Sequence, residues 1–409
     1  MRYVIVGNGA AGVNCIEGIR RVDPEGEIIN ICGEPYPPYS RPLLPHFIEG
    51  IIDEDGVFFR PPSFYKDMKV EPILGDSLVA VETSSNMVVL ASGERIGYDK
   101  LLLATGGKPR PTRIPGVELK NVFHLTTLDA AKEIMRILSE VKTAVILGGG
   151  PLGVKAALAL SVRGKKVKML ITSPQVMSQV LDTKSAFIMK KKLIERGVEV
   201  RVSTSAKAIL GDKKVEEVEL EGGERIKAEL VIIGKGLSPN FSYLNATNAI
   251  KEIRVHDGII VNQFLQTTVP NIYAAGDVAE CYDILTGGSS VVAVWPRASE
   301  QGYYAGCNMA GFPKEYVGGH RMNSLDFDGL SCIVMGDVRT EKPHFKYLIH
   351  EDLKRNIYQR IILEDGKIRG AAIIGRIVNV GGINRFLRRR VNIEPFKASL
   401  LEERATFIY

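Results

Sequence analysis

The chain begins with an apolar run, a glycine-rich break and a segment of periodic apolar positions. Residues 3–6 are all apolar, and Gly7, Gly9 and Gly12 follow them directly. Apolar side chains then recur every three or four positions over residues 13–19. A short apolar run predicts a buried strand, and the longer period predicts a helix. The pattern therefore predicts a strand, a tight turn and a helix in succession.

This turn has the spacing G-x-G-x-x-G, which suits a dinucleotide. The first glycine permits a tight turn, the second lets the backbone approach a pyrophosphate, and the third lets the helix pack on the strand. The N-terminus of this helix offers free N–H groups and a partial positive charge to the phosphates. A second strand over residues 28–32 ends near Glu34, whose carboxylate can accept hydrogen bonds from a ribose. The alternative is a plain glycine-rich turn without a ligand.

The same device recurs at residues 143–164. An apolar run at 144–147 predicts a strand, and a glycine turn and a helix follow it. Residues expected to bind the second dinucleotide here are Gly148, Gly150, Pro151, Leu152, Gly153 and Thr172. The next predicted strand, 167–171, runs into Thr172 and Ser173, so no acid stands where Glu34 stands in the first copy.

The missing acid leaves the choice of nucleotide open. The hydroxyls of Thr172 and Ser173 could donate to a 2′-phosphate, and Arg163, Lys165 and Lys166 are close in sequence. We call the two glycine turns, residues 7–12 and 148–153, the first and second cradles. Three interpretations of the second cradle remain: a preference for NADP, a loose site that takes NADH or NADPH alike, and a site that has lost its ligand. Two cradles that both bind a nucleotide would suit a relay from a mobile hydride donor to a bound flavin.

Composition narrows the class of protein. The chain has 409 residues, 45% of them apolar and 24% charged, which is typical of a globular protein of two or three domains. No apolar run reaches about 18 residues, and no secretory signal is predicted. The five cysteines form no CxxC pair, and the histidines form no HExxH, so no metal site is predicted. We expect a cytoplasmic protein, and the net charge of +6 does not indicate nucleic-acid binding.

Three further segments give the chain a recognisable order. They are "YDKLLLATGGKPR" (98–110), "GKGLSPN" (234–240) and "TTVPNIYAAGDVAE" (267–280). Together with the two glycine turns, they resemble the FAD-dependent pyridine-nucleotide oxidoreductases over nearly the whole chain. The resemblance implies an α/β fold with two Rossmann-like dinucleotide-binding domains, the NAD(P)H domain inserted in the FAD domain, and a C-terminal α+β domain.

The resemblance also implies roles for the matching residues. Asp277 would bind the ribityl or pyrophosphate part of FAD, assisted by the N-terminus of a helix that follows it, although a plain helix N-cap is an alternative. Gly236 would line the NAD(P)H site. The residues implied for FAD are Gly7, Gly9, Ala10, Ala11, Gly12, Glu34, Arg41, Pro42, Ala104, Thr105, Gly106, Gly276, Asp277 and Trp295.

The segment "GEPYPPYSRPLLPHFIEG" (33–50) indicates the branch of the family. Disulfide reductases carry a Cys-x4-Cys pair here, and the peroxidase and coenzyme-A-disulfide branch carries one cysteine, whereas this chain has none between Cys32 and Cys281. The segment is most similar to rubredoxin and ferredoxin reductases, NADH oxidases and the flavin-binding front part of nitrite reductases. Arg41 would contact flavin or pyrophosphate. Several relatives have Ser-Lys or Ser-His where this chain has Pro45-His46, so the lysine is absent, and His46 either approaches the flavin or is an ordinary loop histidine.

The segment "VWPRASEQGYYAGCNMAG" (294–311) matches the helix beside the flavin in the same branch. Small and apolar residues recur in it at helical spacing. Trp295, the only tryptophan, precedes this helix. It is either an aromatic lid over the flavin or an ordinary core residue.

The pattern changes after about residue 320. Short strands with an Asp365-Gly366 hairpin, then a helix over 381–391, resemble the family's C-terminal interface domain. We expect an FAD domain at 1–112 and 241–318, an NAD(P)H domain at 113–240 and an interface domain at 319–409. A basic cluster at the end of the last helix could steer a small acidic electron carrier, or it could be a solvated helix end. Its members are Arg385, Arg388, Arg389 and Arg390.

The expected activity is transfer of hydride from NADH or NADPH to FAD and then of electrons to oxygen, a rubredoxin- or ferredoxin-type protein or another acceptor. No redox-active disulfide takes part. The alternative is an FAD subunit of a larger complex with an iron–sulfur partner, and a structural or sensing flavoprotein with a dead second site is a third possibility. A homodimer is possible from the resemblance. The sequence leaves the acceptor, the nucleotide and the oligomeric state open.

Overall fold

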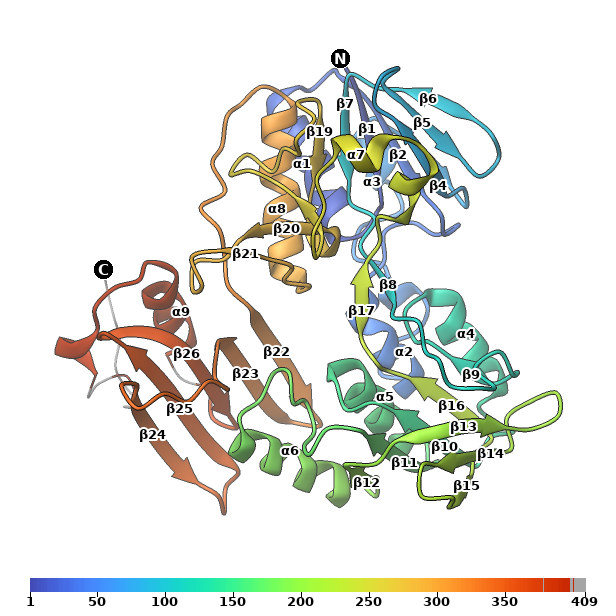
Figure 1. Ribbon diagram of the computed structural model, residues 1–409, viewed down its shortest axis with the longest axis vertical. Coiled ribbons are helices and arrows are strands. Elements are labelled where there is room, and N and C mark those ends of the chain that lie inside the picture. Colours follow the sequence, from blue (N-terminus) through green and yellow to red (C-terminus); the bar gives the residue numbers. More distant parts are fainter. Residues whose placement is uncertain (378, 398–399, 401–409) are drawn as a thin grey trace. The chain divides into compact units, whose positions relative to one another are not determined.

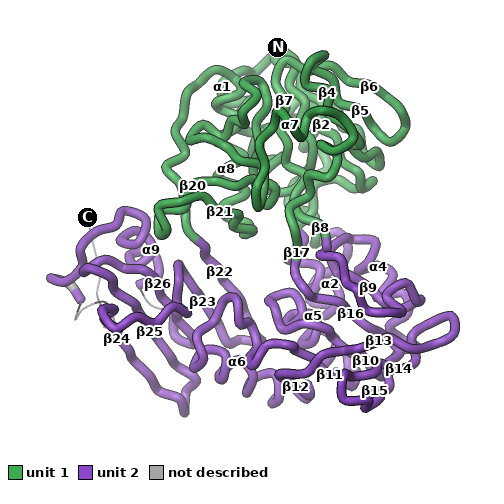
Figure 2. The backbone as a smooth tube through the Cα atoms, in the orientation of Figure 1, with its two compact units in different colours: residues 1–40, 56–108, 237–320 green, residues 41–55, 109–236, 321–409 purple. Residues whose placement is uncertain are grey.

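The computed structural model describes residues 1–377, 379–397 and 400. The chain folds into two compact units, and each is assembled from separate stretches of sequence (Figure 2). The first unit contains residues 1–40, 56–108 and 237–320, and the second contains residues 41–55, 109–236 and 321–409.

The first unit is built on a five-stranded parallel sheet in the order β19-β7-β1-β2-β3. Its strands are β1 (Arg2–Val6), β2 (Glu27–Cys32), β3 (Val70–Leu74), β7 (Lys100–Leu103) and β19 (Ile272–Ala274). The predicted strands at 3–6 and 28–32 are therefore confirmed. Apolar side chains of β1 and β2 are almost wholly buried, which explains why these strands read as continuous apolar runs.

Two helices, α1 (Ala10–Val22) and α8 (Trp295–Met309), lie side by side in this unit (Figure 1). They approach so closely that a Cβ at Gly302 would collide with the carbonyl of Ala11, and one at Gly306 would collide with that of Cys15. The small residues predicted to recur at helical spacing in α8 thus allow the close approach to α1.

The rest of the first unit consists of short elements. They are α3 (Phe64–Asp67), β4 (Leu78–Glu82), β5 (Met87–Leu90), β6 (Arg95–Gly97), η3 (Ser242–Ala246), α7 (Ala249–Glu252), β18 (Ile259–Ile260), η4 (Gly276–Val278), β20 (Ala279–Tyr282) and β21 (Ser289–Ser290). Two strands, β8 (Gly107–Pro109) and β17 (Leu237–Pro239), pair where the chain passes between the units.

The second unit contains another parallel sheet, in the order β12-β11-β10-β16-β9. Its strands are β9 (Val122–Phe123), β10 (Thr143–Leu147), β11 (Lys166–Ile171), β12 (Glu199–Val202) and β16 (Leu230–Ile233). Around it lie η1 (Arg41–Leu43), α2 (Leu44–Glu49), α4 (Leu128–Ile137), α5 (Pro151–Val162), α6 (Thr183–Glu195), β13 (Ala206–Leu210), β14 (Glu217–Leu220) and β15 (Arg225–Lys227). Residues 41–55, which we expected in the first piece of the FAD domain, belong to this unit.

The C-terminal part of the second unit is an antiparallel sheet in the order β22-β23-β26-β25-β24. Its elements are β22 (Met322–Phe327), β23 (Leu330–Gly336), β24 (Lys346–Asp352), β25 (Ile357–Glu364), β26 (Lys367–Ile374), α9 (Val380–Arg388) and η5 (Glu394–Phe396). The Asp365-Gly366 hairpin joins β25 to β26, and both turn residues have positive φ, as the two-residue turn requires. The α/β fold class and the C-terminal α+β part agree with the sequence prediction.

Candidate functional site

Two positions of the first glycine turn, Gly7 and Gly12, have no room for a side chain. Gly7 has a φ of 110°, and a Cβ there would collide with the carbonyl of Ala104. A Cβ at Gly12 would collide with the carbonyl of Gly7. Helix α1 starts from Gly9, which has no side chain to cap it, so the N–H groups of its first turn are available to an anion. This geometry fits the pyrophosphate of a dinucleotide.

Glu34 follows β2, where the sequence predicted a ribose-binding acid. It is half-buried, and its Oε2 accepts a hydrogen bond of 2.7 Å from the hydroxyl of Tyr39. The carboxylate is thus held in place by a neighbouring side chain. The structure fits its predicted role, which stays a prediction.

Asn30, a residue of β2 that the sequence analysis did not identify, supports this turn. Its amide donates to the carbonyl oxygens of Ile5, at 3.0 Å, and Gly7, at 3.1 Å, and it is wholly buried. Asn8 donates in the same way to the carbonyl of Tyr36, at 2.8 Å. The signal for Asn30 was present, since an asparagine in an otherwise apolar strand needs hydrogen-bond partners when it is buried.

The turn containing Gly276 and Asp277 lies against helices α1 and α8. Gly276 has a φ of 80°, and a Cβ there would be 3.1 Å from the Cβ of Ala11 and 3.5 Å from that of Ala298. Its N–H donates to Oε1 of Gln301 at 2.8 Å, a partner that sequence reasoning missed. Asp277, half-buried, is therefore presented beside the first turn of α1.

The predicted helix after Asp277 is wrong. Residues 276–278 form a single 3₁₀ turn, and the chain continues directly into strand β20. The helix starts near Gly276 belong instead to α1 and α8, which arrive from distant parts of the sequence. The motif was correct, but the local element assigned to it was not.

The segment Ala104-Thr105-Gly106 closes the other side of the first cradle. Ala104 donates its N–H to the carbonyl of Val6 at 2.8 Å, so it continues the sheet beside Gly7. The Thr105 hydroxyl donates to the carbonyl of Asn240 at 2.6 Å, and Gly106 accepts from the N–H of Asn240 at 2.9 Å. These bonds hold together the two strands that leave the first unit.

The second glycine turn repeats the construction of the first. A Cβ at Gly148 would collide with the carbonyl of Gly234, just as one at Gly7 meets Ala104. A Cβ at Gly153 would collide with the carbonyl of Gly148. Gly150 differs, because a Cβ there would meet nothing within 4 Å, and it starts α5 without a side-chain cap. Open space beside an uncapped helix start, with Pro151 and Leu152 in its first turn, fits a pyrophosphate.

The cations that sequence proximity suggested for a 2′-phosphate lie at the wrong end of this fold. Arg163 follows the last residue of α5, about 20 Å along the helix from Gly150, and donates to the carbonyl of Ile48 at 2.8 Å. Lys166 begins β11 and Lys165 precedes it, and Lys166 is about 20 Å along the strand from the ribose end at Thr172. Closeness in sequence did not mean closeness in space, because the intervening strand is fully extended.

The segment 41–55 contacts the sheet-covering helices of the second unit. Arg41 is exposed and donates to the carbonyl of Thr126 at 2.9 Å, and Pro42 beside it is exposed as well. His46 lies on α2, with its Nδ1 3.5 Å from Oε2 of Glu49. The flavin contacts predicted for these residues stay predictions.

Two other predicted site residues have clear surroundings. Trp295 is the first residue of α8 and is half-buried, with the ring of Phe59 edge-on at a centroid distance of 4.9 Å. Gly236 has a φ of 93°, and its carbonyl accepts from the N–H of Arg110 at 3.1 Å. Neither contact tests the cofactor roles that the sequence suggested.

All five cysteines are buried thiols and none forms a disulfide. Burial raises the pKa of the Cys281 and Cys332 thiols to about 12. Cys32 lies under the first cradle, where its sulfur is 3.0 Å from Oδ1 of Asn8. The raised pKa values therefore disfavour the thiolate, the reactive form of cysteine, at Cys281 and Cys332.

We expect the native protein to resist thiol reagents. At pH 8, Ellman's reagent should label less than one thiol per chain within minutes, and five after denaturation, because buried thiols with raised pKa values stay protonated. Rapid labelling of a single native cysteine, located by mass spectrometry, would contradict this and would reopen thiol chemistry.

Two further kinds of site are absent from the described part of the chain. No helix there combines the length and the apolar character that crossing a bilayer requires. The same residues contain no group of three or more His, Cys, Asp or Glu side chains placed to hold a metal ion.

Known proteins share this arrangement. Residues 1–302 match the family described as pyridine nucleotide-disulphide oxidoreductase, and residues 322–390 match the rubredoxin NAD+ reductase C-terminal domain. Among solved structures, the covalent putidaredoxin reductase–putidaredoxin complex is 26% identical, with a TM-score of 0.89 over 98% of this chain and 96% of the other.

Two relatives show different degrees of coverage. The assimilatory nitrate reductase electron transfer subunit of Bacillus subtilis is 27% identical over 376 residues, which are 91% of this chain and 47% of the relative. The NADH-dependent phenylglyoxylate dehydrogenase subunit epsilon of Aromatoleum evansii is 29% identical over 400 residues, which are 97% of this chain and 94% of the relative. The chain thus spans about half of the first protein and nearly all of the second.

Proposed function

Because this chain belongs to the pyridine nucleotide-disulphide oxidoreductase family, which uses FAD and NAD(P)H, we propose that it is a reductase for a small redox protein. The observation that carries the proposal is the repetition of one cradle in two sheets. In both cradles, the first glycine packs against a backbone carbonyl, that of Ala104 in the first and that of Gly234 in the second. In both, the helix that follows starts at a glycine and has no side-chain cap.

The residues of the first cradle suit FAD. Glu34 would accept hydrogen bonds from the adenosine ribose, and the first turn of α1 would bind the pyrophosphate. Asp277 would bind the ribityl end, with Gly276 keeping it close to Ala11. When bound, FAD accepts a hydride from reduced nicotinamide and passes electrons on singly. The protein's own task is to orient both nucleotides and to exclude competing reactions.

The domain boundaries follow from these roles. Residues 1–112 and 241–318 would form the FAD domain, residues 113–240 the NAD(P)H domain, and residues 319–409 an interface domain. Within the last, Arg385, Arg388 and Arg389 are exposed at the end of α9. A cluster of exposed cations there would attract an acidic electron carrier. The match of this region to a rubredoxin reductase domain supports such a partner.

A second candidate is an FAD subunit that works only within a larger complex. The two relatives named above support it, since each is named as a subunit, and one of them is nearly coextensive with this chain. In that case an iron–sulfur partner would replace the free carrier. Size-exclusion chromatography of native extract separates the candidates, because a subunit would elute with its partners.

Anaerobic titration with NADH and with NADPH tests the central claim. We expect either nucleotide to bleach the flavin absorbance near 450 nm, with reoxidation by oxygen and by rubredoxin then used to rank acceptors. Gly150→Val should keep FAD but lose bleaching at the same nucleotide concentration, because its side chain would fill the open space at α5. The matched control is Gly222→Val, in a hairpin turn where a Cβ also meets nothing within 4 Å. Failure of both nucleotides to bleach wild-type flavin would rule out the free reductase.

A further inference from the structure

The loop of residues 172–182 joins the second cradle to the C-terminal sheet. It leaves the carboxyl end of β11, which is where a parallel sheet places the adenosine ribose of a bound dinucleotide. The Met177 N–H donates to the carbonyl of Gly149, the middle residue of the glycine turn, at 2.7 Å. Val176 and Met177 are buried, so the loop is anchored against the cradle at this point. Ser178 and Gln179 come next in the loop, and we refer to these two residues as its rim.

Two arginines of the C-terminal sheet region reach this rim. Arg321 Nη1 donates to the carbonyl of Gln179 at 3.1 Å. Arg339 Nη1 lies 3.4 Å from the carbonyl of Ser178 and 3.5 Å from Oε1 of Gln179. Two guanidinium groups from far along the chain therefore gather at the loop that follows the ribose end of β11.

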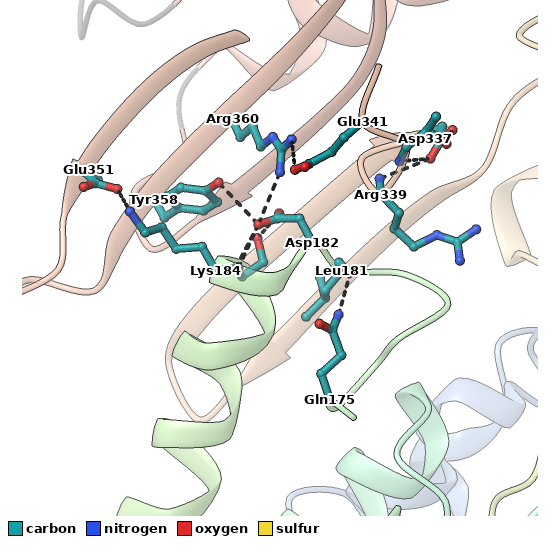
Figure 3. A network of polar contacts seen from close by, with 12 residues as sticks. Gln175, Leu181, Asp182, Lys184, Asp337, Arg339, Glu341, Glu351, Tyr358 and Arg360 are labelled. Atoms are coloured by element: carbon teal, nitrogen blue, oxygen red, sulfur yellow. Dashed lines mark hydrogen bonds and ion pairs between the residues drawn. The ribbon is translucent and has the colours of Figure 1, made fainter. Parts of the chain in front are cut away.

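Arg339 is held in place by its own turn. Oδ1 of Asp337 accepts from the N–H groups of Arg339, at 3.1 Å, and Thr340, at 3.2 Å, and Arg369 lies 3.6 Å from the other carboxylate oxygen. Figure 3 shows the Arg339 side chain extending from this turn toward the loop that carries Gln175 and Leu181. Burial opposes ionisation of Asp337, yet hydrogen bonds from Thr340 and from the turn lower its pKa. The Asp337 carboxylate is thus neutralised by Arg369 and by the N–H groups of its turn. The guanidinium of Arg339 is not used for this and can bind another group.

The guanidinium of Arg339 has unused donors. It is exposed, and in the described part of the chain its only hydrogen bonds are the two long ones made by Nη1. A guanidinium presents five N–H donors in a planar fork that matches phosphate oxygens. The end of β11, from which the 172–182 loop leaves, carries Thr172 and Ser173 in place of a carboxylate that would repel a phosphate.

The far end of the loop is fixed to the same sheet. Oδ1 of Asp182 lies 3.3 Å from the hydroxyl of Tyr358 and 3.8 Å from Nη1 of Arg360 (Figure 3). All three side chains are buried. The loop and the arginine-bearing turn therefore belong to one compact structure, which places the cations reproducibly.

We propose that Arg339 and Arg321, contributed by the C-terminal domain, bind the 2′-phosphate of NADPH at the adenosine end of the second cradle. The pair takes the place of Arg163, Lys165 and Lys166, which the fold carries to the opposite end. This inference rests on the proposed function only in assigning that cradle to a nicotinamide nucleotide. It makes the C-terminal domain a determinant of nucleotide choice as well as a surface for partners.

The test uses two nucleotides that differ in one phosphate. Calorimetry of the purified holoprotein with 2′,5′-ADP and with 5′-AMP should show at least about ten-fold tighter binding of 2′,5′-ADP. Arg339→Ala and Arg321→Ala should each weaken 2′,5′-ADP by about ten-fold and leave 5′-AMP unchanged. Arg339→Lys should recover part of the loss, because it keeps the charge without the fork.

The matched control is Arg355→Ala, since Arg355 is an exposed arginine of the same domain whose side chain pairs only with Asp352 at 3.6 Å in the described residues. It should change neither affinity. Equal affinity of the wild type for the two nucleotides would overturn the proposal. So would equal weakening of both by Arg339→Ala, which would mean that the arginine only positions the loop.

The same protein separates this inference from the proposed function. Bleaching of the flavin by NADH without any preference for 2′,5′-ADP would leave the reductase standing and remove the arginine site. A clear preference for 2′,5′-ADP without bleaching by NADPH would support the arginine site and would contradict the proposed reductase.

Discussion

Gly12→Ala should abolish FAD binding, so that the protein purifies colourless. The new Cβ would collide with the carbonyl of Gly7, a backbone atom that cannot move without opening the turn. Helix α1 would then retreat from β1, and its first-turn N–H groups would no longer converge on the pyrophosphate. We expect at least about a hundred-fold loss of FAD affinity, which corresponds to roughly 3 kcal/mol. The measurement is flavin released per chain on denaturation, followed by titration of the apoprotein with FAD.

Gly381→Ala is the matched control for this change. Gly381 lies inside α9 and is exposed, and a Cβ added there would meet nothing within 4 Å, so alanine should leave the flavin content unchanged. Thermal unfolding and far-UV circular dichroism of the Gly12→Ala apoprotein distinguish a lost site from a lost fold. A yellow Gly12→Ala protein with wild-type affinity would show that the first cradle does not hold the flavin as proposed.

The parts of the fold that the sequence predicted well are those set by neighbouring residues. Both cradles could be predicted because a buried strand, three spaced glycines and a helix are all specified within about 20 residues. The hairpin at Asp365-Gly366 is equally local, since its two residues take positive φ in place. Each of these predictions depends on backbone geometry that one short segment determines.

Predictions that depended on distance through the fold were less secure. Asp277 was placed before a helix because its motif belongs beside helix starts, but those starts come from α1 and α8. Arg163 and Lys166 were placed near Thr172 because they are close in sequence, although the extended strand β11 separates Lys166 from Thr172 by about 20 Å. Arg339 could not be linked to Gln179, because 160 residues lie between them. Only the packing of one sheet against a distant loop brings such residues together.

Asp182→Ala should cause the largest loss of stability among substitutions outside the cradles. Asp182 is 4% exposed and caps α6 by accepting from the N–H groups of Lys184, at 3.1 Å, and Ser185, at 3.2 Å. It is also the buried carboxylate facing Arg360, which is 8% exposed. Without Asp182, the guanidinium of Arg360 keeps, among the described residues, an ion pair only with the exposed Glu341, at 2.9 Å. Loss of the buried partner should cost about 3 kcal/mol. Urea unfolding of the holoprotein, followed by far-UV circular dichroism, measures the change.

Two other variants separate the charge from the helix cap. Asp182→Asn keeps an oxygen for the N–H groups of α6 and should lose less stability than Asp182→Ala. Glu133→Ala breaks an exposed pair with Arg136 and should leave the unfolding midpoint unchanged. If Asp182→Asn is as unstable as Asp182→Ala, the charge opposite Arg360 is what matters. If Asp182→Ala unfolds like the wild type, the buried pair does not hold the 172–182 loop to the C-terminal sheet. The arginines at its rim would then have to be positioned by the Asp337 turn alone.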